Sequence, residues 1–74
     1  MNELELEILE KLASKIKKRR KELNLSQEKL AEICNFDRTY ISLLERSKRN
    51  PSVLNLHKLS VGLKTSLSEL LSKI

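Results

Sequence analysis

Polar side chains recur at the spacing of one helix face between residues 38 and 46. If Ile41 and Leu44 face a core, the exposed side of such a helix carries two guanidinium groups and two hydroxyl groups, from Arg38, Thr39, Ser42 and Arg46. Guanidinium groups donate to guanine edges and to phosphates, and hydroxyl and methyl groups also suit base edges. Tyr40 lies on the flank, where it could equally belong to the edge of the core. The pattern favours contact with DNA, with an ordinary solvated helix face as the alternative.

Residue types that support catalysis or metal binding are scarce. His57 is the only histidine, and no second His, Cys or carboxylate pair stands at ligand spacing, so we expect a half-buried surface histidine. Cys34, the only cysteine, is expected to be a small core side chain. The serines have no histidine base in a triad pattern. We predict no enzyme, no cofactor, no metal and no small-molecule substrate.

Length and charge narrow the class of protein. Seventy-four residues with 39% apolar content predict a single domain over residues 1–74, marginally stable unless it is well idealised or oligomeric. A net charge of +5 favours a polyanionic partner. No stretch approaches the roughly 18 apolar residues of a membrane span, and the start MNELELEILE lacks the basic residues of a signal peptide. With a lone cysteine, which suits a reducing compartment, these features predict a cytoplasmic protein without a membrane partner.

The fold class predicted from local patterns is all-α and compact. Gly62 and Pro51 are the only Gly and Pro, so hairpin turns have almost nothing to be made from. Five helices are predicted, over Asn2 to about Leu23, Gln27 to Cys34, Arg38 to about Arg46, from about Ser52, and Ser66 to Ile74. Ser26 and Asp37 are expected N-caps, and Ser66 with Glu69 forms a capping box. The expected buried residues include Leu30, Ala31 and Ile33 in the second helix and Val53, Leu56, Leu59 and Leu63 in the fourth.

The second and third predicted helices are separated by about three residues, which suits a helix-turn-helix. Such a turn holds the later helix across the earlier one, so that it can enter the ~12 Å wide major groove of DNA. The first helix is acidic at its start and basic later, at Lys11, Lys15, Lys17, Lys18, Arg19, Arg20 and Lys21. These charges match the helix macrodipole, and some of the cations could instead contact phosphates.

The run NLSQEKLAEICNFDRTYISLLERSKRNPSVLNLHKLSVGLKTSLSELL, about fifty residues long, resembles the lambda-repressor-like (Cro/repressor, XRE) helix-turn-helix family. Within that family, the segments DRTYIS over residues 37–42 and ERSKRN over residues 45–50 are similar to the controller proteins of restriction–modification systems. The resemblance implies a dimeric transcription regulator that binds near-palindromic operators and both activates and represses restriction–modification genes. Alternatives are a phage-type or chromosomal repressor of the same fold, or an antitoxin-like protein-interaction module.

The resemblance also implies roles for individual residues. Together with the polar face described above, it predicts base contacts from Arg38, Thr39, Tyr40, Ser42 and Arg49. Phosphate contacts are predicted from Gln27, Arg46, Ser47, Lys48 and Asn50, with Gln27 also bracing the recognition helix. Arg20 and Glu45 match a structural ion pair that is buried in many members. Asn24, Asn35 and Lys64 stand where the family usually has Gly, and Arg19 where it is commonly apolar.

The last eight residues carry four large apolar side chains, more than one narrow core contact needs. We therefore predict a dimer interface made by Val53, Leu67, Leu70, Leu71 and Ile74. A two-fold dimer would turn two recognition helices toward successive major grooves about 34 Å apart. Glu28 and Glu32, outward on the second helix, are candidate contacts to RNA polymerase, with solvated carboxylates as the alternative.

Overall fold

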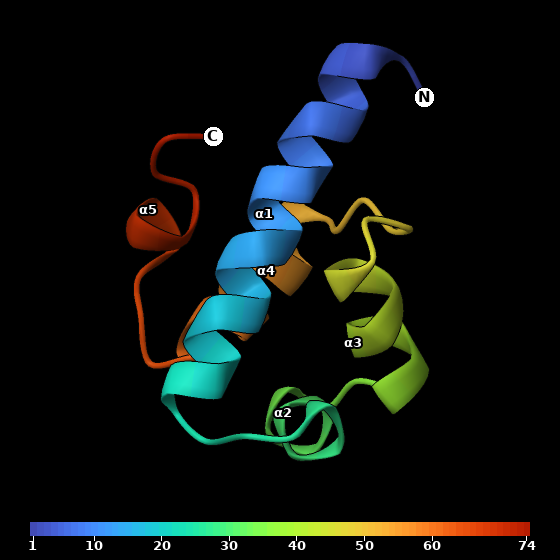
Figure 1. The fold of residues 1–74 in the computed structure, drawn as a ribbon. Helices are drawn as coiled ribbons and strands as arrows, with labels where there is room; N and C mark the ends of the chain where they lie inside the picture. Colours follow the sequence, from blue (N-terminus) through green and yellow to red (C-terminus); the bar gives the residue numbers. More distant parts are fainter.

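A computed structural model describes residues 1–74 as five helices and no strands (Figure 1). The helices are α1 Glu3–Glu22, α2 Gln27–Cys34, α3 Arg38–Glu45, α4 Val53–Gly62 and α5 Leu67–Leu70. In Figure 1 the long α1 crosses the molecule, with α3 to its right, α5 to its left, α4 behind it and α2 below its C-terminal end. The predicted all-α, five-helix class is confirmed. None of the five helices combines the length and the apolar composition that a membrane span requires.

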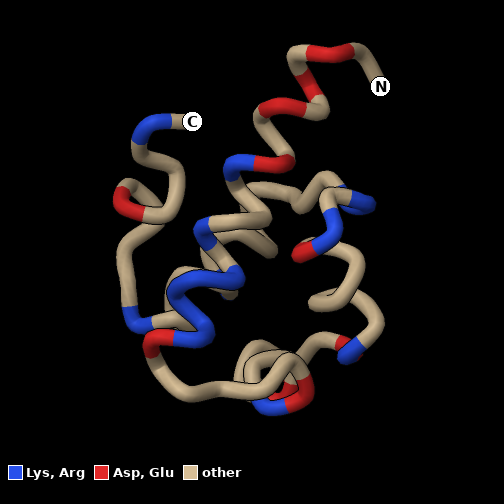
Figure 2. The backbone as a smooth tube through the Cα atoms, viewed as in Figure 1, with Lys and Arg blue, Asp and Glu red and all other residues tan.

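Helix α1 begins and ends as its sequence predicts. The Asn2 side chain accepts a hydrogen bond of 2.9 Å from the Glu5 backbone N–H, which satisfies one of the free donors at the helix start. Figure 2 shows acidic residues along the first part of α1 and basic residues along the last part, so each sign lies at the favourable end of the helix dipole.

The turns between helices use residues other than Gly in the left-handed region. Asn24 (φ 57°), Asn35 (φ 60°) and Lys64 (φ 54°) adopt it, at the three positions where the resemblance implies Gly. Asn tolerates this conformation better than most residues, and at Lys64 the carbonyl accepts a hydrogen bond of 3.1 Å from Arg19 Nη2. Asp37 was expected to cap α3 with its side chain, but its carboxylate accepts no such bond. Backbone bonds to its carbonyl, from Tyr40 at 3.0 Å and Ile41 at 3.4 Å, begin that helix instead.

All five helices contribute side chains to the core. Its fully buried members include Ile16, Leu30, Ile41, Leu59 and Leu63. The prediction that Ile33 and Val53 are buried is wrong, because Ile33 is 48% exposed and Val53 is 72% exposed. Leu30, Ala31 and Cys34 already fill the inward side of the short α2, and Val53 lies in the first turn of α4, where residues Leu56 and Leu59 turn inward.

Gly62 allows α2 and α4 to approach closely. A Cβ at this position would lie 2.5 Å from the Cys34 Sγ, closer than carbon and sulfur can pack. This contact explains a glycine inside a helix, where it ordinarily costs about 0.5–1 kcal/mol relative to Ala. Cys34 is buried as predicted, and burial raises the pKa of its thiol.

The C-terminal segment differs from its prediction. Helix α5 ends at Leu70 rather than Ile74, and the chain turns away with Lys73 in the left-handed region. Ser66 accepts a bond of 2.9 Å from the Glu69 backbone N–H, but Glu69 makes no return bond, so the capping box is half formed. Leu70 is only 3% exposed and lies in the molecule's own core. The side chain predicted for the dimer interface is thus covered by the chain's own residues.

Candidate nucleic-acid interface

A buried ion pair fixes α3 against α1. Arg20 Nε lies 2.6 Å from Glu45 Oε2, and Arg20 Nη2 lies 2.9 Å from Oε1, so the pair is bidentate. The two side chains are 10% and 3% exposed. Arg20 also donates to the Leu25 carbonyl at 2.8 Å, and Gln27 Nε2 donates to Glu45 Oε1 at 3.1 Å. The first turn of α2, the end of α1 and the end of α3 are thus joined by one network.

The network controls the protonation of Glu45. Burial raises the pKa of Glu45, but the hydrogen bonds from Arg20 and Gln27, with the charges of Arg20 and Lys17, outweigh it and leave the pKa below its ordinary value. The hydrogen bond to Glu45 conversely raises the pKa of Arg20, against a smaller opposing effect of burial. Both residues therefore stay charged at neutral pH, and no buried side-chain polar atom is left without a partner.

The outer face of α3 and the following loop carry free cations. Arg38, Arg46, Lys48 and Arg49 are exposed, and none has a carboxylate within ion-pair distance. Thr39 is exposed beside Arg38, and Ser42 is half-buried. This unpaired surface has donors for both base edges and phosphates, and a polyanion would supply the missing counter-charge.

Tyr40 lies apart from this exposed face. It is half-buried, its ring meets Phe36 edge to face with 4.9 Å between centroids, and its hydroxyl accepts a bond of 3.0 Å from Asn55 on α4. Tyr40 therefore lies at the edge of the core, which is the alternative to a DNA contact that its sequence position allows. Asn55 was missed by sequence reasoning, because a polar residue on a helix gives no sign of which partner it will meet.

The loop after α3 is shaped by a tight helix end. Ser47 adopts φ 62°, and the Lys48 backbone N–H donates to the Leu43 carbonyl at 2.8 Å. Lys48, Arg49 and Asn50 are exposed on this loop, and buried Pro51 ends it. Gln27 is half-buried, and its amide is directed at Glu45, which corresponds to the bracing role expected of it.

The remaining expected residues fall on other surfaces. Glu28 is exposed without a partner, whereas Glu32 is exposed and lies 3.6 Å from the Lys29 ammonium. Leu71 is 40% exposed, and Leu67 and Ile74 are half-buried against the core. Leu54 and Val61, seven residues apart on one face of α4, are also exposed and were not predicted as interface residues.

Two of the sequence expectations concern metal-binding residues and His57. No group of three or more His, Cys, Asp or Glu residues could hold a metal ion. His57 is exposed on α4 rather than half-buried as expected.

A family model described as helix-turn-helix matches residues 16–70. The chain belongs to the helix-turn-helix family. Two of its relatives in that family are control proteins. C.MunI of Mycoplasma sp is 47% identical over 100% of this chain and 96% of that protein. C.SmaI of Serratia marcescens is 43% identical over 92% of this chain and 81% of that protein. The resemblance inferred from residues 37–42 and 45–50 is confirmed.

Solved structures of helix-turn-helix proteins show the same fold. The restriction–modification controller protein C.AhdI from Aeromonas hydrophila superimposes with a TM-score of 0.81 at 37% identity, covering 84% of this chain and 94% of that one. The controller protein C.Esp1396I, solved as a tetramer in complex with its natural 35-base-pair operator, gives a TM-score of 0.80 at 42% identity over 89% of this chain and 91% of that one. The fold of this chain is therefore shared with solved restriction–modification controller proteins.

Proposed function

We propose that this chain is a cytoplasmic controller protein of a restriction–modification system, which binds operator DNA as a dimer and both activates and represses transcription. The observation that carries the proposal is the set of exposed, unpaired cations on α3 and its following loop, held by the buried Arg20–Glu45 pair. The kinship with control proteins supports the regulatory role. The function needs no catalytic group or cofactor.

Recognition would follow from the geometry of α2 and α3. Helix α3 would enter the major groove, where Arg38 can donate to guanine O6 and N7 together, a contact worth about 1–3 kcal/mol of base discrimination. Thr39 and Ser42 would contact neighbouring base edges. Arg49 would add a base contact from the loop, and the phosphates would be held by Arg46, Ser47, Lys48, Asn50 and the α2 start at Gln27.

A dimer would set the spacing of the two recognition helices. Leu71 and Val53 are the exposed apolar residues of the expected interface, with Leu67 and Ile74 half-buried beside the core. A two-fold arrangement places two α3 helices about 34 Å apart, one turn of DNA, and so favours a near-palindromic operator.

Activation would require a second surface. Glu28 is exposed and unpaired at the start of α2, which makes it the better candidate for contact with RNA polymerase, whereas Glu32 is already close to Lys29. Replacing Glu28 by Lys should lower activated transcription while leaving operator affinity unchanged or slightly higher. A promoter assay beside a binding assay separates the two effects, and equal losses in both would contradict a polymerase contact.

The base and phosphate roles can be tested by two single substitutions. Arg38→Ala should relax base preference at one position of each half-site. Lys48→Ala should weaken binding to all sequences alike and reduce the salt dependence of the affinity by about one unit for each phosphate that the protein no longer neutralises. Binding titrations over a range of salt on operator and mismatched duplexes measure both quantities. A uniform loss from both substitutions would contradict the assigned roles.

A further inference from the structure

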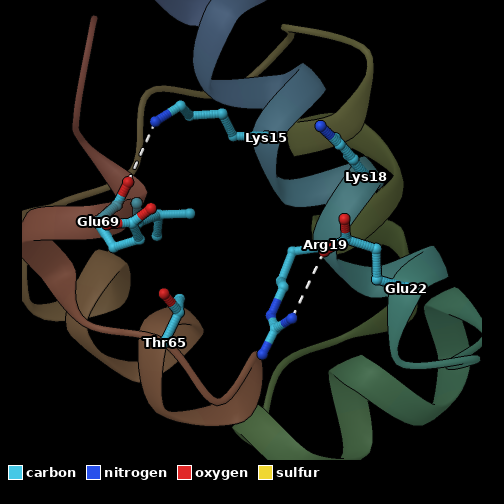
Figure 3. Close-up of a pocket in the computed structure, with 7 residues that line it drawn as sticks. Lys15, Lys18, Arg19, Glu22, Thr65 and Glu69 are labelled. Atoms are coloured by element: carbon cyan, nitrogen blue, oxygen red, sulfur yellow. Dashed lines mark hydrogen bonds and ion pairs between the residues drawn. The ribbon is translucent and has the colours of Figure 1, made fainter.

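Two cations of α1 bind the carbonyl groups at the ends of α4 and α5. Lys15 Nζ donates to the Glu69 carbonyl at 3.1 Å, to Ser72 Oγ at 2.7 Å and to the Ser72 carbonyl. One turn further along α1, Arg19 Nε donates to the Leu63 carbonyl at 2.9 Å, and Arg19 Nη2 donates to the Lys64 carbonyl at 3.1 Å. Figure 3 shows both side chains reaching from α1 across a shared pocket toward the C-terminal segment.

These contacts satisfy groups that a helix cannot satisfy itself. The last carbonyls of a helix lack partners within it and carry the negative end of its dipole, so a cation there is stabilising. The need is greatest at α5, since four residues make too short a helix to be stable alone. Ser72 Oγ also donates to the Glu69 carbonyl at 2.9 Å, so Lys15 completes a closed set of bonds around the end of α5.

The same segment carries the apolar residues of the expected dimer face. Leu70 is inserted in the core, and Leu67 and Leu71 flank it in sequence. The direction of α5 is therefore fixed from one side by Leu70 and from the other by the Lys15 ammonium. A change at Lys15 would leave Leu70 in the core but remove the hydrogen bonds to Glu69 and Ser72, on either side of Leu71.

We propose that Lys15 and Arg19 are positioning residues for the dimer face rather than contacts to DNA. This inference depends on the proposed function, because it assumes that the α5 surface joins two copies. Lys15 already donates to three acceptors, and Arg19 donates to two backbone carbonyls and to the Glu22 carboxylate at 3.5 Å. The Glu69 carboxylate lines the same pocket. A phosphate would meet occupied donors and like charge at this place, whereas the α3 loop offers free cations.

The pocket also supplies a matched control. Lys18 lines it beside Lys15 but makes no hydrogen bond or ion pair. Lys15→Met and Lys18→Met each remove one positive charge from the same face of α1. Sedimentation of the full chain should show dimerisation weakened about tenfold by Lys15→Met, the size expected for removal of a charged hydrogen bond, and changed less than about twofold by Lys18→Met.

A tethered dimer separates positioning from DNA contact. Two copies joined by a flexible Gly/Ser linker no longer depend on the interface for association. Tethered Lys15→Met should bind operator within about twofold of the tethered wild type with an unchanged salt slope. A tethered variant that still binds weakly with a smaller salt slope would overturn the inference, because Lys15 would then be a phosphate contact. Equal dimerisation by Lys15→Met and wild type would also overturn it.

A milder substitution guards against simple unfolding. Ser72→Ala removes one acceptor of Lys15 and leaves every charge in place, and it should weaken dimerisation about threefold with an unchanged helical circular dichroism signal. No change in dimerisation by this variant would count against the inference. Failure of the proposed function has a different signature, since the wild-type chain would then remain a monomer at tens of micromolar and on DNA.

Discussion

The α3 face and the C-terminal end of this molecule differ in what they leave exposed. The α3 face and its loop expose cations without partners, over a buried ion pair whose hydrogen bonds are complete. The C-terminal end exposes the apolar side chain of Leu71 beside a helix of four residues that is hydrogen-bonded to α1. A charged surface whose backbone is fixed by a buried ion pair suits a polyanion that binds in one orientation. An apolar surface on a short helix suits a second copy of the chain, which would bury it.

The largest effect is expected from breaking the support of the α3 face. Arg20→Met would leave the Glu45 carboxylate buried and unpaired, which should cost about 3–5 kcal/mol of unfolding free energy. Urea unfolding followed by circular dichroism measures this loss. The double variant Arg20→Met/Glu45→Leu should recover much of it, because no isolated charge remains. A loss below about 1 kcal/mol in the single variant would show that the pair behaves like an exposed one.

The same pair predicts a pH dependence. Because the folded-state pKa of Glu45 is lowered, its contribution to stability is fully present above the unfolded pKa of about 4.3 and is lost as the pH falls through the lower folded value. The free energy of unfolding of the wild type should therefore decrease below about pH 4.3 more steeply than that of Arg20→Met/Glu45→Leu. Parallel curves for the two proteins would contradict a lowered pKa.

The next effect tests the apolar end. Leu71→Glu should place a charge in the dimer face and weaken dimerisation by at least about thirtyfold, because apolar burial is reduced and a carboxylate is desolvated. The monomer should stay folded, since Leu71 is 40% exposed. Leu4→Glu is the matched control on the exposed start of α1 and should leave the dimer unchanged. If both variants dimerise equally in sedimentation experiments, Leu71 is not part of the dimer interface.

A smaller effect concerns the contact that joins α2 to α4. Gly62→Ala should lower the unfolding free energy by about 1–2 kcal/mol, since overpacking against the Cys34 Sγ exceeds the gain in helix propensity. In a Cys34→Ala background the same substitution should be neutral or stabilising. Thermal or urea unfolding of the four proteins gives the coupling between the two sites. If the effects of Gly62→Ala and Cys34→Ala on the unfolding free energy are additive, the contact between α2 and α4 does not limit the side chain at position 62.

The smallest effect separates the two possible roles of Tyr40. Tyr40→Phe removes its bond with Asn55 and should cost about 1 kcal/mol of stability, with a similar cost for Asn55→Leu. If Tyr40 also contacts DNA, only Tyr40→Phe should alter base preference at one operator position. Unfolding and operator-binding measurements on both variants distinguish a bond that only joins α3 to α4 from one that also serves recognition.

Local signals predicted much of the fold and of the polar face. The capping Ser26 and the reversing Asn35 set α2 to the residue, and the left-handed conformations of Asn24 and Asn35 follow from their place in the turns. Arg38, Thr39 and Arg46 are exposed because Ile41 and Leu44 take the inward side of α3, as helical periodicity predicts.

The errors arise where distant segments decide the outcome. Ile33 faces outward because its neighbours fill the space beneath α2, and α5 ends early where Lys15, more than fifty residues away in sequence, binds its last carbonyls. Arg19, at a position where the resemblance implies an apolar residue, donates to carbonyls at the end of α4 that lie 44 and 45 positions later in the sequence. The periodicity of the sequence does not predict which distant carbonyl a long side chain will bind.

The central claim is that the α3 face recognises base sequence in a two-fold arrangement. Selection of bound duplexes from a random pool, followed by sequencing, tests it most directly for the wild type and Arg38→Ala. We predict a near-palindromic motif with half-sites about one helical turn apart for the wild type, and a loss of preference at one symmetric pair of positions for Arg38→Ala. Two results would contradict the account. Either the bound duplexes share no sequence motif, or the wild type and Arg38→Ala select identical motifs.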